Sequence, residues 1–523
     1  MTRSFCIRLA PLALAVSLAL PAQQFDVMET TIADVHAAFR SGKLTARQLT
    51  QMYLDRIEAY DKQGPKINAV ITVNPHALDD AGKLDALFRK SGLAGPLHGI
   101  PVVFKDQMDV AGLPTTLGSL VMKNNIPVRD SFVVEKMKKA GAIVLAKVTL
   151  GEMGGGDTYG SLFGETRNPY DTERTVGGSS GGTGAAVNAN YATIGVGQEG
   201  FASIRRPSTW NSIVGMRPTP GLVSRGGVWA GWPSKVGSLG PMTRTVTDLA
   251  TLLDVMVGYD PDDPVTAYGY GKAPQTYTQF LNKNGLKGAR IGVIRQTMGQ
   301  FSEPDSEDFK NITTVFDRAV ADLKKQGAEI VDPITIPRLT ELLAARGNGG
   351  VTAGAGDPAA VYFTRNPASP MKNMQDVRNH PDYGKVRRRS DGGREAPRTG
   401  GLTEDAARDE LTLAVMKIMA DYKLDAIVHK SVEHSPTLIK DGIAPPYVNH
   451  KGAPHLNTFL IFAASIAVPA GFTPQGLPAG ITFFGRPYSE PKLIQFAYAF
   501  EQATRHRVPP KSLPALPLKR ASR

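Results

Sequence analysis

The sequence predicts an α/β fold in which helices pack on a largely parallel or mixed β-sheet. Short apolar runs of strand length alternate with longer segments of helical apolar spacing along most of the 523 residues. The composition, with 41% hydrophobic and 21% charged residues, is that of a folded globular protein. No repeat of about 20 to 50 residues is present, which argues against a solenoid or a propeller.

Three helices and two buried strands are predicted in the first third of the chain. Apolar residues recur at helical spacing over 32–40, 46–60 and 131–140, and Thr45 is a candidate N-cap for the second helix. Residues 99–105 (GIPVVFK) and 142–147 (AIVLAK) are apolar runs of strand length. The first of these strands ends on a charged residue, Lys105.

The same alternation resumes in the second half. It predicts a strand over 288–295, a helix near 306–326, and further strands over 424–429, 465–469 and 479–484. Residues 340–402 are polar, irregular and rich in Gly, Pro, Asn and Arg, so we expect a surface excursion that forms one side of a substrate entrance. No break in composition divides the chain, and residues 23–523 are interpreted as one domain.

The first 22 residues have the layout of a secretory signal peptide. Arg3 and Arg8 form a basic start, an apolar run covers residues 9–20, and Pro21-Ala22 precedes two glutamines. The run is shorter than the roughly 20 residues of a membrane span, although an uncleaved N-terminal anchor is the alternative. This layout predicts export to a periplasm or an extracellular space. Cleavage after Ala22 would also remove Cys6, the only cysteine, and a chain without cysteines suits such a compartment.

The net charge of +12 raises the question of a nucleic-acid partner. Two of these charges belong to the predicted signal peptide. Much of the excess lies in two short basic runs, at 385–389 and 518–523, and neither contains interleaved aromatic residues. We interpret both runs as solvated surface and predict no nucleic-acid partner.

The most unusual stretch is 175–186, TVGGSSGGTGAA, in which Ser179 and Ser180 stand between glycine pairs. A flexible linker is one reading of such a composition. The stretch is short, however, and leads into a segment that is compatible with a helix. A phosphate-binding loop of the GxxxxGK[ST] type is another reading, but the lysine of that pattern is missing.

A second serine-containing stretch, GVGQEGFASIRRP over 195–207, places Ser203 about two dozen positions after Ser179. Together with Lys105 in LHGIPVVFKD, these serines resemble the amidase signature family. The segments RNPYD, GMRP, GPMTRTVTD, AVPAGFTPQGLPAG and EQATRHR follow in the family's order, so the resemblance covers nearly all of the chain after residue 22. It implies a large, mixed and twisted sheet covered by helices on both faces.

The resemblance also implies a role for each of the three side chains. Ser203 would attack the amide carbonyl, Ser179 would relay the proton, and Lys105 would be the base that later protonates the leaving amine. The family's relay serine follows a cis peptide bond, here between Gly178 and Ser179. No metal and no cofactor is implied.

The oxyanion donors implied by the resemblance are main-chain N–H groups just before the nucleophile. Here the family's usual glycine pair is replaced by Phe201-Ala202, and a position often held by Asp is Glu199. We expect these departures to reshape the acyl pocket, because side chains restrict φ. The expected oxyanion residues are Gly200, Phe201 and Ala202, and the residues expected to support the loops are Gly178, Ser180 and Arg205.

The residue types agree with this chemistry. A serine hydroxyl is a weak nucleophile until a base removes its proton. A lysine can be that base only when it is neutral, and burial at the end of an apolar strand favours the neutral form. We therefore expect activity that rises toward alkaline pH.

Other functions are less well supported by the sequence. A Ser-His-Asp hydrolase would need a nucleophile elbow of the GxSxG type, and we expect His98, His429 and His434 to be structural. No HExxH pattern is present. Within the family, the ammonia-releasing component of a glutamine-dependent amidotransferase is an alternative, as is a non-catalytic binding protein on the same scaffold. The sequence favours an exported, cofactor-free amidase for small or peptide-like carboxamides, with some esterase activity.

Overall fold

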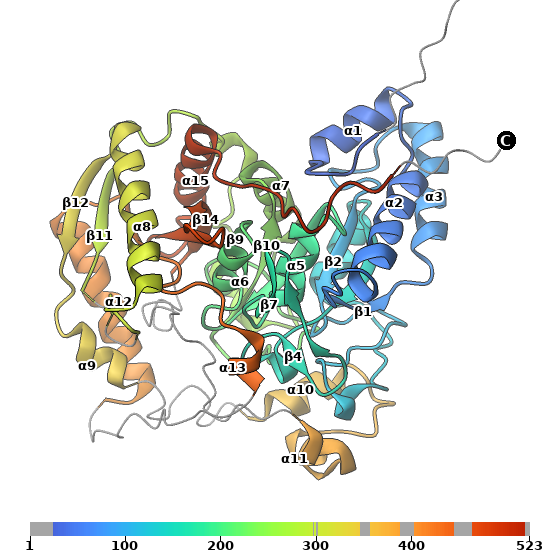
Figure 1. Cartoon of the computed structure of the whole chain (residues 1–523). Coiled ribbons are helices and arrows are strands. Elements are labelled where there is room, and N and C mark those ends of the chain that lie inside the picture. The colour runs from blue at the N-terminus through green and yellow to red at the C-terminus, as the bar shows by residue number, and fades with distance from the viewer. Residues whose placement is uncertain are drawn as a thin grey trace, which may run out of the picture.

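The computed structural model describes residues 25–296, 298–299, 302–345, 356–386, 402–443 and 463–517. Its centre is an 11-stranded sheet with the order β1-β3-β2-β8-β10-β9-β14-β15-β13-β11-β12 (Figure 1). The pairs β2–β3, β2–β8, β11–β12 and β11–β13 are parallel and the other pairs are antiparallel. The predicted large mixed sheet is therefore confirmed.

The strands of this sheet are mostly short and buried. Their bounds are β1 Val70–Val73, β2 Pro101–Lys105, β3 Ile143–Val148, β8 Ile194–Glu199, β9 Val214–Arg217, β10 Ser238–Thr243, β11 Arg290–Ile294, β12 Glu329–Ile334, β13 Ala426–Lys430, β14 Ser465–Phe472 and β15 Pro478–Phe484. Two small hairpins, β4–β5 (Tyr159–Gly160 and Gly164–Glu165) and β6–β7 (Arg167–Asn168 and Asp171–Thr175), lie outside it.

The α-helices range from 5 to 19 residues. They are α1 Ile32–Arg40, α2 Ala46–Ile57, α3 Ala77–Ser91, α4 Phe132–Lys139, α5 Gly181–Asn188, α6 Arg205–Trp210, α7 Val246–Met256, α8 Glu307–Lys325, α9 Leu339–Ala344, α10 Pro358–Thr364, α11 Met374–Asn379, α12 Glu404–Asp421, α13 Ile439–Ile443 and α15 Glu490–Thr504. None of the helices in the described ranges is long and apolar enough to cross a membrane.

Local sequence signals explain where several helices begin. Thr45 caps α2 by accepting a hydrogen bond from the backbone N–H of Gln48, as predicted, and the Gln48 side chain completes a capping box. Ser306 caps α8 in the same way, through the N–H of Phe309. The predicted helix over 46–60 is α-helical only to Ile57 and continues as a π-helical turn over Glu58–Lys62.

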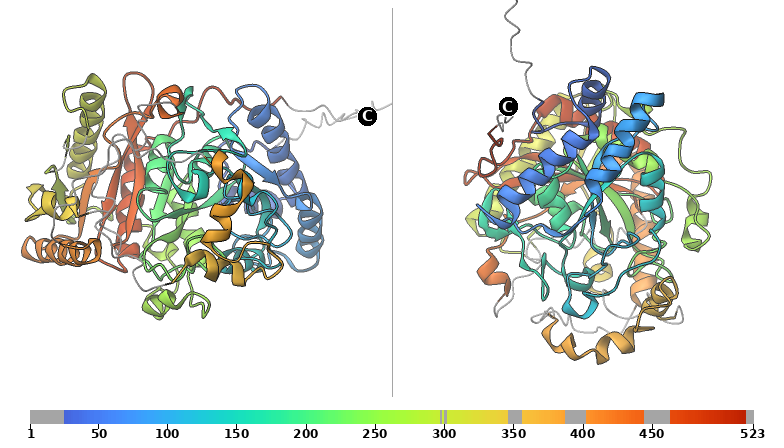
Figure 2. Two further views of the ribbon diagram at one scale, coloured as in Figure 1. Left: turned by 90° about the horizontal axis from the view of Figure 1, so that it is seen from below. Right: turned by 90° about the vertical axis from the view of Figure 1, so that its right-hand side faces the viewer.

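Helices cover both faces of the sheet, as the pleat of β15 shows. A Cβ on Gly480 would lie 3.1 Å from Thr209, so this position faces α6. Phe483, of opposite parity, packs its ring against Phe496 and Phe500 of α15, and alternate residues of a strand point to opposite faces. Figure 2 shows α1–α3 gathered at one end of the molecule and α8, α9 and α12 at the other.

Glycines in the central strands let α5 and α6 lie close to the sheet. A Cβ on Gly197 would lie 3.0 Å from the Ser180 hydroxyl, and one on Gly215 would lie 2.0 Å from the Ser208 hydroxyl. A Cβ on Gly195 would lie 2.6 Å from Thr183 of α5. Glycine inside a strand is tolerated where another element approaches the backbone closely. This close approach brings the start of α5 against the ends of β2 and β8.

The excursion over 340–402 differs from its prediction. Its described parts include α9, α10 and α11 as well as the irregular stretch 365–373, while 346–355 and 387–401 lie outside the described residues. Tyr362 and Phe363 of α10 pack edge-on against Trp229, and Leu117 belongs to the same buried cluster. The composition pointed to a surface loop, but a few aromatic residues in it are enough to anchor short helices.

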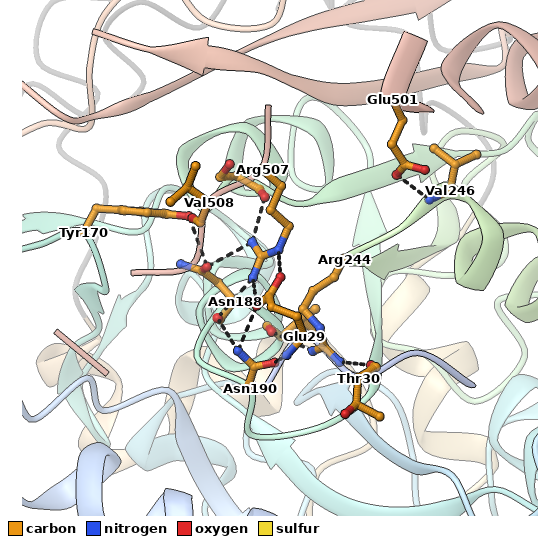
Figure 3. Close-up of polar contacts among 12 residues, drawn as sticks. Glu29, Thr30, Tyr170, Asn188, Asn190, Arg244, Val246, Glu501, Arg507 and Val508 are labelled. Carbon is orange, nitrogen blue, oxygen red and sulfur yellow. Dashed lines mark hydrogen bonds and ion pairs between the residues drawn. The ribbon is translucent and has the colours of Figure 1, made fainter. Parts of the chain in front are cut away.

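Both ends of the described chain meet at the C-terminal end of α5 (Figure 3). Arg507 forms an ion pair with Glu29 at 2.6 Å and donates to the Asn188 side chain at 3.1 Å. Arg244 donates to the main-chain oxygens of Thr30 and Val187, at 2.6 and 3.0 Å. These cations satisfy carbonyl groups at a helix end, where positive charge is favourable. The far end of α5 is thereby fixed, and its N-terminus lies at the site described next.

Candidate active site

Lys105 is the last residue of β2 and its side chain is completely buried. β2 lies between β3 and β8, so the apolar strand carries the amine into the interior. The Nζ atom of Lys105 donates hydrogen bonds to the Ser179 hydroxyl at 2.7 Å and to the main-chain oxygen of Gln198 at 3.3 Å. The sequence-predicted lysine and first serine are therefore in contact.

The second serine completes a chain of three groups. The Oγ atoms of Ser179 and Ser203 are 3.0 Å apart and hydrogen-bonded. Ser179 is 1% exposed, whereas Ser203 is partly exposed at the turn that leads into α6. The peptide bond between Gly178 and Ser179 is cis, as the resemblance implied. Accessibility thus increases from the amine, through the middle hydroxyl, to the outer one.

The glycine-rich stretch is rigidly packed rather than flexible. A Cβ on Gly178 would lie 2.2 Å from the main-chain oxygen of Gly156, which leaves no room for a side chain. The N–H of Ser180 donates to the Ser203 carbonyl at 3.0 Å, and the Ser180 hydroxyl donates to the Gln198 carbonyl at 3.0 Å. Ser180 therefore ties the two serine-bearing loops together, and the linker interpretation does not hold.

The electrostatics of the site favour a neutral Lys105. Burial lowers the pKa of Lys105 well below its ordinary value of 10.5, although the Glu199 carboxylate opposes this effect. The neighbouring Lys147 is equally buried, but it forms an ion pair with Asp106 at 2.9 Å. Among the described residues, no carboxylate lies within ion-pair distance of Lys105. Neutral Lys105 keeps two N–H groups and a lone pair, which allows it to bind Gln198 and accept a proton from Ser179.

The loop before Ser203 is organised by Glu199. Its buried carboxylate accepts hydrogen bonds from the backbone N–H groups of Ile204 and Arg205, at 2.8 and 3.0 Å, and from the Arg205 guanidinium. Arg205 also donates to the main-chain oxygen of Phe201 at 3.1 Å. In a trans peptide the C=O and the following N–H point in opposite directions. The N–H of Ala202 therefore points away from Arg205.

Gly200 and Phe201 are partly exposed, and a Cβ on Gly200 would meet no atom within 4 Å. Ala202 is buried. The loop thus has open space beside Gly200, three positions before the partly exposed Ser203.

Two site residues were not predicted from the sequence. Arg206 donates to the main-chain oxygen of Gly178 at 3.0 Å and forms an ion pair with Asp157 at 2.6 Å. Both side chains are buried. Arg206 directly follows Arg205 in the segment IRRP, and these two adjacent arginines could have drawn attention to Arg206. Asp157 lies in a different segment and had no distinguishing pattern.

The three histidines that were considered take structural roles. His98 accepts a hydrogen bond from the N–H of Ala94 and packs against Phe39 and Phe88. His434 interacts with Asp308, and the buried His429 hydrogen-bonds the main-chain oxygen of Lys430 at 2.6 Å and packs against Phe484. Within the described ranges, no group of three or more His, Cys, Asp and Glu side chains is placed to hold a metal ion.

Comparison with known proteins identifies relatives over nearly the whole chain. A family model described as Amidase matches residues 48–494. The chain is 32% identical to a probable amidase of Arabidopsis thaliana (93% of this chain, 92% of the relative) and 33% identical to a subunit of the glutamyl-tRNA(Gln) amidotransferase of Geobacter sp. (92% and 98%). The crystal structure of native peptide amidase from Stenotrophomonas maltophilia is similar at a TM-score of 0.79 and 33% identity, covering 92% of this chain and 98% of that one.

Proposed function

The chain belongs to the amidase signature family and is an amidase, and we propose that it hydrolyses carboxamides through an acyl-enzyme on Ser203. The observation that carries the proposal is the hydrogen-bonded series Lys105–Ser179–Ser203, with contacts of 2.7 and 3.0 Å. It runs from a fully buried amine to a partly exposed hydroxyl. Such a series can remove a proton from the outer oxygen and store it on the inner nitrogen.

Acylation follows from this arrangement. The Ser203 oxygen forms a bond to the amide carbonyl carbon while its proton passes to Ser179, and the Ser179 proton passes to the lone pair of Lys105. The N–H groups near Gly200 and Ala202 bind the negative oxygen that develops. When the C–N bond breaks, the proton returns through Ser179 to the leaving nitrogen, so that the amine departs neutral.

Deacylation uses the same groups in the same order. Neutral Lys105, regenerated when the amine leaves, accepts through Ser179 the proton of an attacking water. The water oxygen bonds to the acyl carbon, the Ser203 ester bond breaks, and the proton returns to Ser203. The products are a carboxylic acid and an amine or ammonia.

We propose small or peptide-like carboxamides as substrates. Support comes from the similarity to peptide amidase over 92% of the chain. Phe201 and Ala202, in place of the glycine pair, would narrow the acyl side of the site.

A panel of aliphatic amides, anilides and N-acylated dipeptide amides, incubated with the purified protein and with Ser203→Ala, tests the proposal. We expect turnover of at least one class by the wild type only; activity retained by Ser203→Ala would contradict it.

A second candidate is a role like that of the glutamyl-tRNA(Gln) amidotransferase relative. That relative is 33% identical over 92% of this chain, which is close to the 32% over 93% of the probable amidase. Hydrolysis of simple amides by the purified chain on its own would favour the amidase role. A strict requirement for glutamine and for partner proteins would favour the second.

We also propose, from the sequence of residues 1–22 alone, that the chain is exported and cleaved after Ala22. These residues lie outside the part of the chain that the structure describes. N-terminal sequencing of the protein recovered from a bacterial periplasm tests this: a mature chain that starts at Gln23 is expected, and an intact Met1 would contradict it.

A further inference from the structure

We propose that Arg206, held by Asp157, positions Ser179 for proton transfer to the leaving amine. This inference rests on the proposed function, because it assigns a partner to the relay serine. Arg206 does not touch the reacting atoms and acts through the main chain that precedes Ser179.

The backbone on both sides of Ser179 is anchored. On one side the Arg206 guanidinium donates to the Gly178 carbonyl at 3.0 Å, and on the other side the Ser179 carbonyl accepts from the N–H of Gly151 at 3.0 Å. A peptide unit is planar, so a donor that holds the Gly178 oxygen restricts the orientation of the plane that ends at the Ser179 Cα. The direction of the Ser179 side chain then depends on that plane. Of these two anchors, only the guanidinium is a side chain.

The guanidinium itself has little freedom. It forms the 2.6 Å ion pair with Asp157, and its central carbon lies 5.4 Å from the centroid of the Trp210 ring. Trp210 is buried and donates through its indole N–H to the His434 carbonyl at 3.0 Å. Arg206 is therefore held by a carboxylate and by an aromatic ring that is itself fixed. A flat, rigid donor in such a frame can hold one carbonyl oxygen at a defined place.

The position of Ser179 matters because it has two partners at once. Its oxygen lies 2.7 Å from the Lys105 nitrogen and 3.0 Å from the Ser203 oxygen. A displacement of about 1 Å can reduce a rate about 100-fold when it spoils such an alignment. The effect must depend on the leaving group. Both substrates need the relay to deprotonate Ser203 and the attacking water, but only the amide nitrogen must in addition receive the relayed proton, because a nitrophenolate departs without one.

The experiment compares an anilide and the p-nitrophenyl ester of the same acyl group. Arg206→Met removes the donor to Gly178 but leaves the buried Asp157 carboxylate without its arginine partner. A double variant that also carries Asp157→Asn removes this unpaired charge. The matched control is Arg225→Met, since Arg225 is also buried and forms a 2.8 Å ion pair with Asp263. Its guanidinium donates to Asp263 and to the main-chain oxygens of Ser234 and Val236, rather than to Ser179 or Ser203.

We expect kcat/KM for the anilide to fall about 10- to 100-fold in Arg206→Met and in the double variant. The ester rate is expected to fall as well, but by less than the anilide rate, so the amide-to-ester ratio drops. Arg225→Met is expected to lower Tm while keeping the wild-type ratio. Equal losses on both substrates, or no loss, would overturn the inference. If Arg206→Met does not fold, the double variant decides.

Failure of this inference is distinguishable from failure of the proposed function. Ser203→Ala is measured on the same two substrates. If it is inactive on both while the ratio in the Arg206 variants stays at the wild-type value, only the positioning role is wrong. If Ser203→Ala keeps amide hydrolysis, the acyl-enzyme mechanism and the positioning role both fail.

Discussion

The side-chain nitrogen of Lys105 lies 2.7 Å from the hydroxyl oxygen of Ser179, although the two residues are 74 positions apart. β2 ends at one of them, and the other immediately precedes Ser180, the N-cap of α5. The contact exists because glycines in the central strands allow α5 to lie close to the sheet. A buried amine and a hydroxyl group are thereby held together without exposure to solvent.

The first prediction concerns pH. Burial lowers the pKa of Lys105 well below 10.5, and only the neutral amine can accept a proton. We expect kcat/KM for amides to rise with pH and to level off well below pH 10.5. In Lys105→Met this rise is expected to disappear and the rate to fall by about 10² to 10⁴.

The control for this prediction is Lys83→Met, because the Lys83 side chain is largely exposed and pairs with Asp80 rather than with a residue of the site. Its pH profile is expected to match the wild type. An acidic optimum for the wild type, or an unchanged rising limb in Lys105→Met, would contradict the role of Lys105 as the base. The measurement is kcat/KM from about pH 5 to 10 on one amide.

The second prediction concerns Glu199, which accepts the backbone N–H groups of Ile204 and Arg205. Glu199→Gln leaves the Arg205 guanidinium buried without its full counter-charge, which we expect to cost about 3–5 kcal/mol of unfolding free energy. It also loosens the loop that carries the proposed oxyanion donors, so we expect kcat to fall about 10- to 1,000-fold.

Asp263→Asn is the matched control for Glu199→Gln, because it removes the partner of another buried arginine, Arg225. Both variants are expected to lose stability in urea unfolding. Only Glu199→Gln is expected to lose kcat per folded molecule. Equal kcat values in the two variants would show that Glu199 has no part in organising the loop.

The third prediction concerns stability rather than activity. Burial raises the pKa of Glu501, which accepts the N–H of Val246 at 2.8 Å, from 4.5 to about 7 (Figure 3). A carboxyl with a raised pKa in the folded state contributes stability that is complete below pH 4.5 and is lost as the pH rises through about 7. In Glu501→Gln, which can still accept this bond, we expect the difference in Tm between about pH 4.5 and 7.5 to be smaller than in the wild type. An identical difference would contradict the assignment.

The mixed α/β class and several of its helices and strands could be predicted from the sequence. Apolar runs such as 142–147 become buried strands, and Thr45 acts as the predicted N-cap because its side chain satisfies a free N–H group at the helix start. The strand β8 was not predicted, because its glycines at 195 and 197 lower its apolar content. Those glycines follow from the approach of α5 and α6, which no local pattern reveals.

The three side chains of the proposed mechanism were accessible to sequence reasoning because a strand-end lysine, the glycine-flanked Ser179 and a serine 24 positions later together resemble a family motif. The ion pair between Arg206 and Asp157 was not, because it joins two segments that only the tertiary fold brings together. The short helices of the excursion were missed for a related reason. Their stability comes from packing against Trp229, in a distant part of the chain.

The most direct test of the account is to trap the acyl-enzyme. The protein is mixed with an activated ester, quenched in acid within milliseconds to seconds, and measured as an intact mass and after proteolysis. The account predicts one acyl group per molecule, carried by the peptide that contains Ser203 and absent in Ser203→Ala. Turnover without a covalent intermediate, or an acyl group that remains in Ser203→Ala, would contradict it.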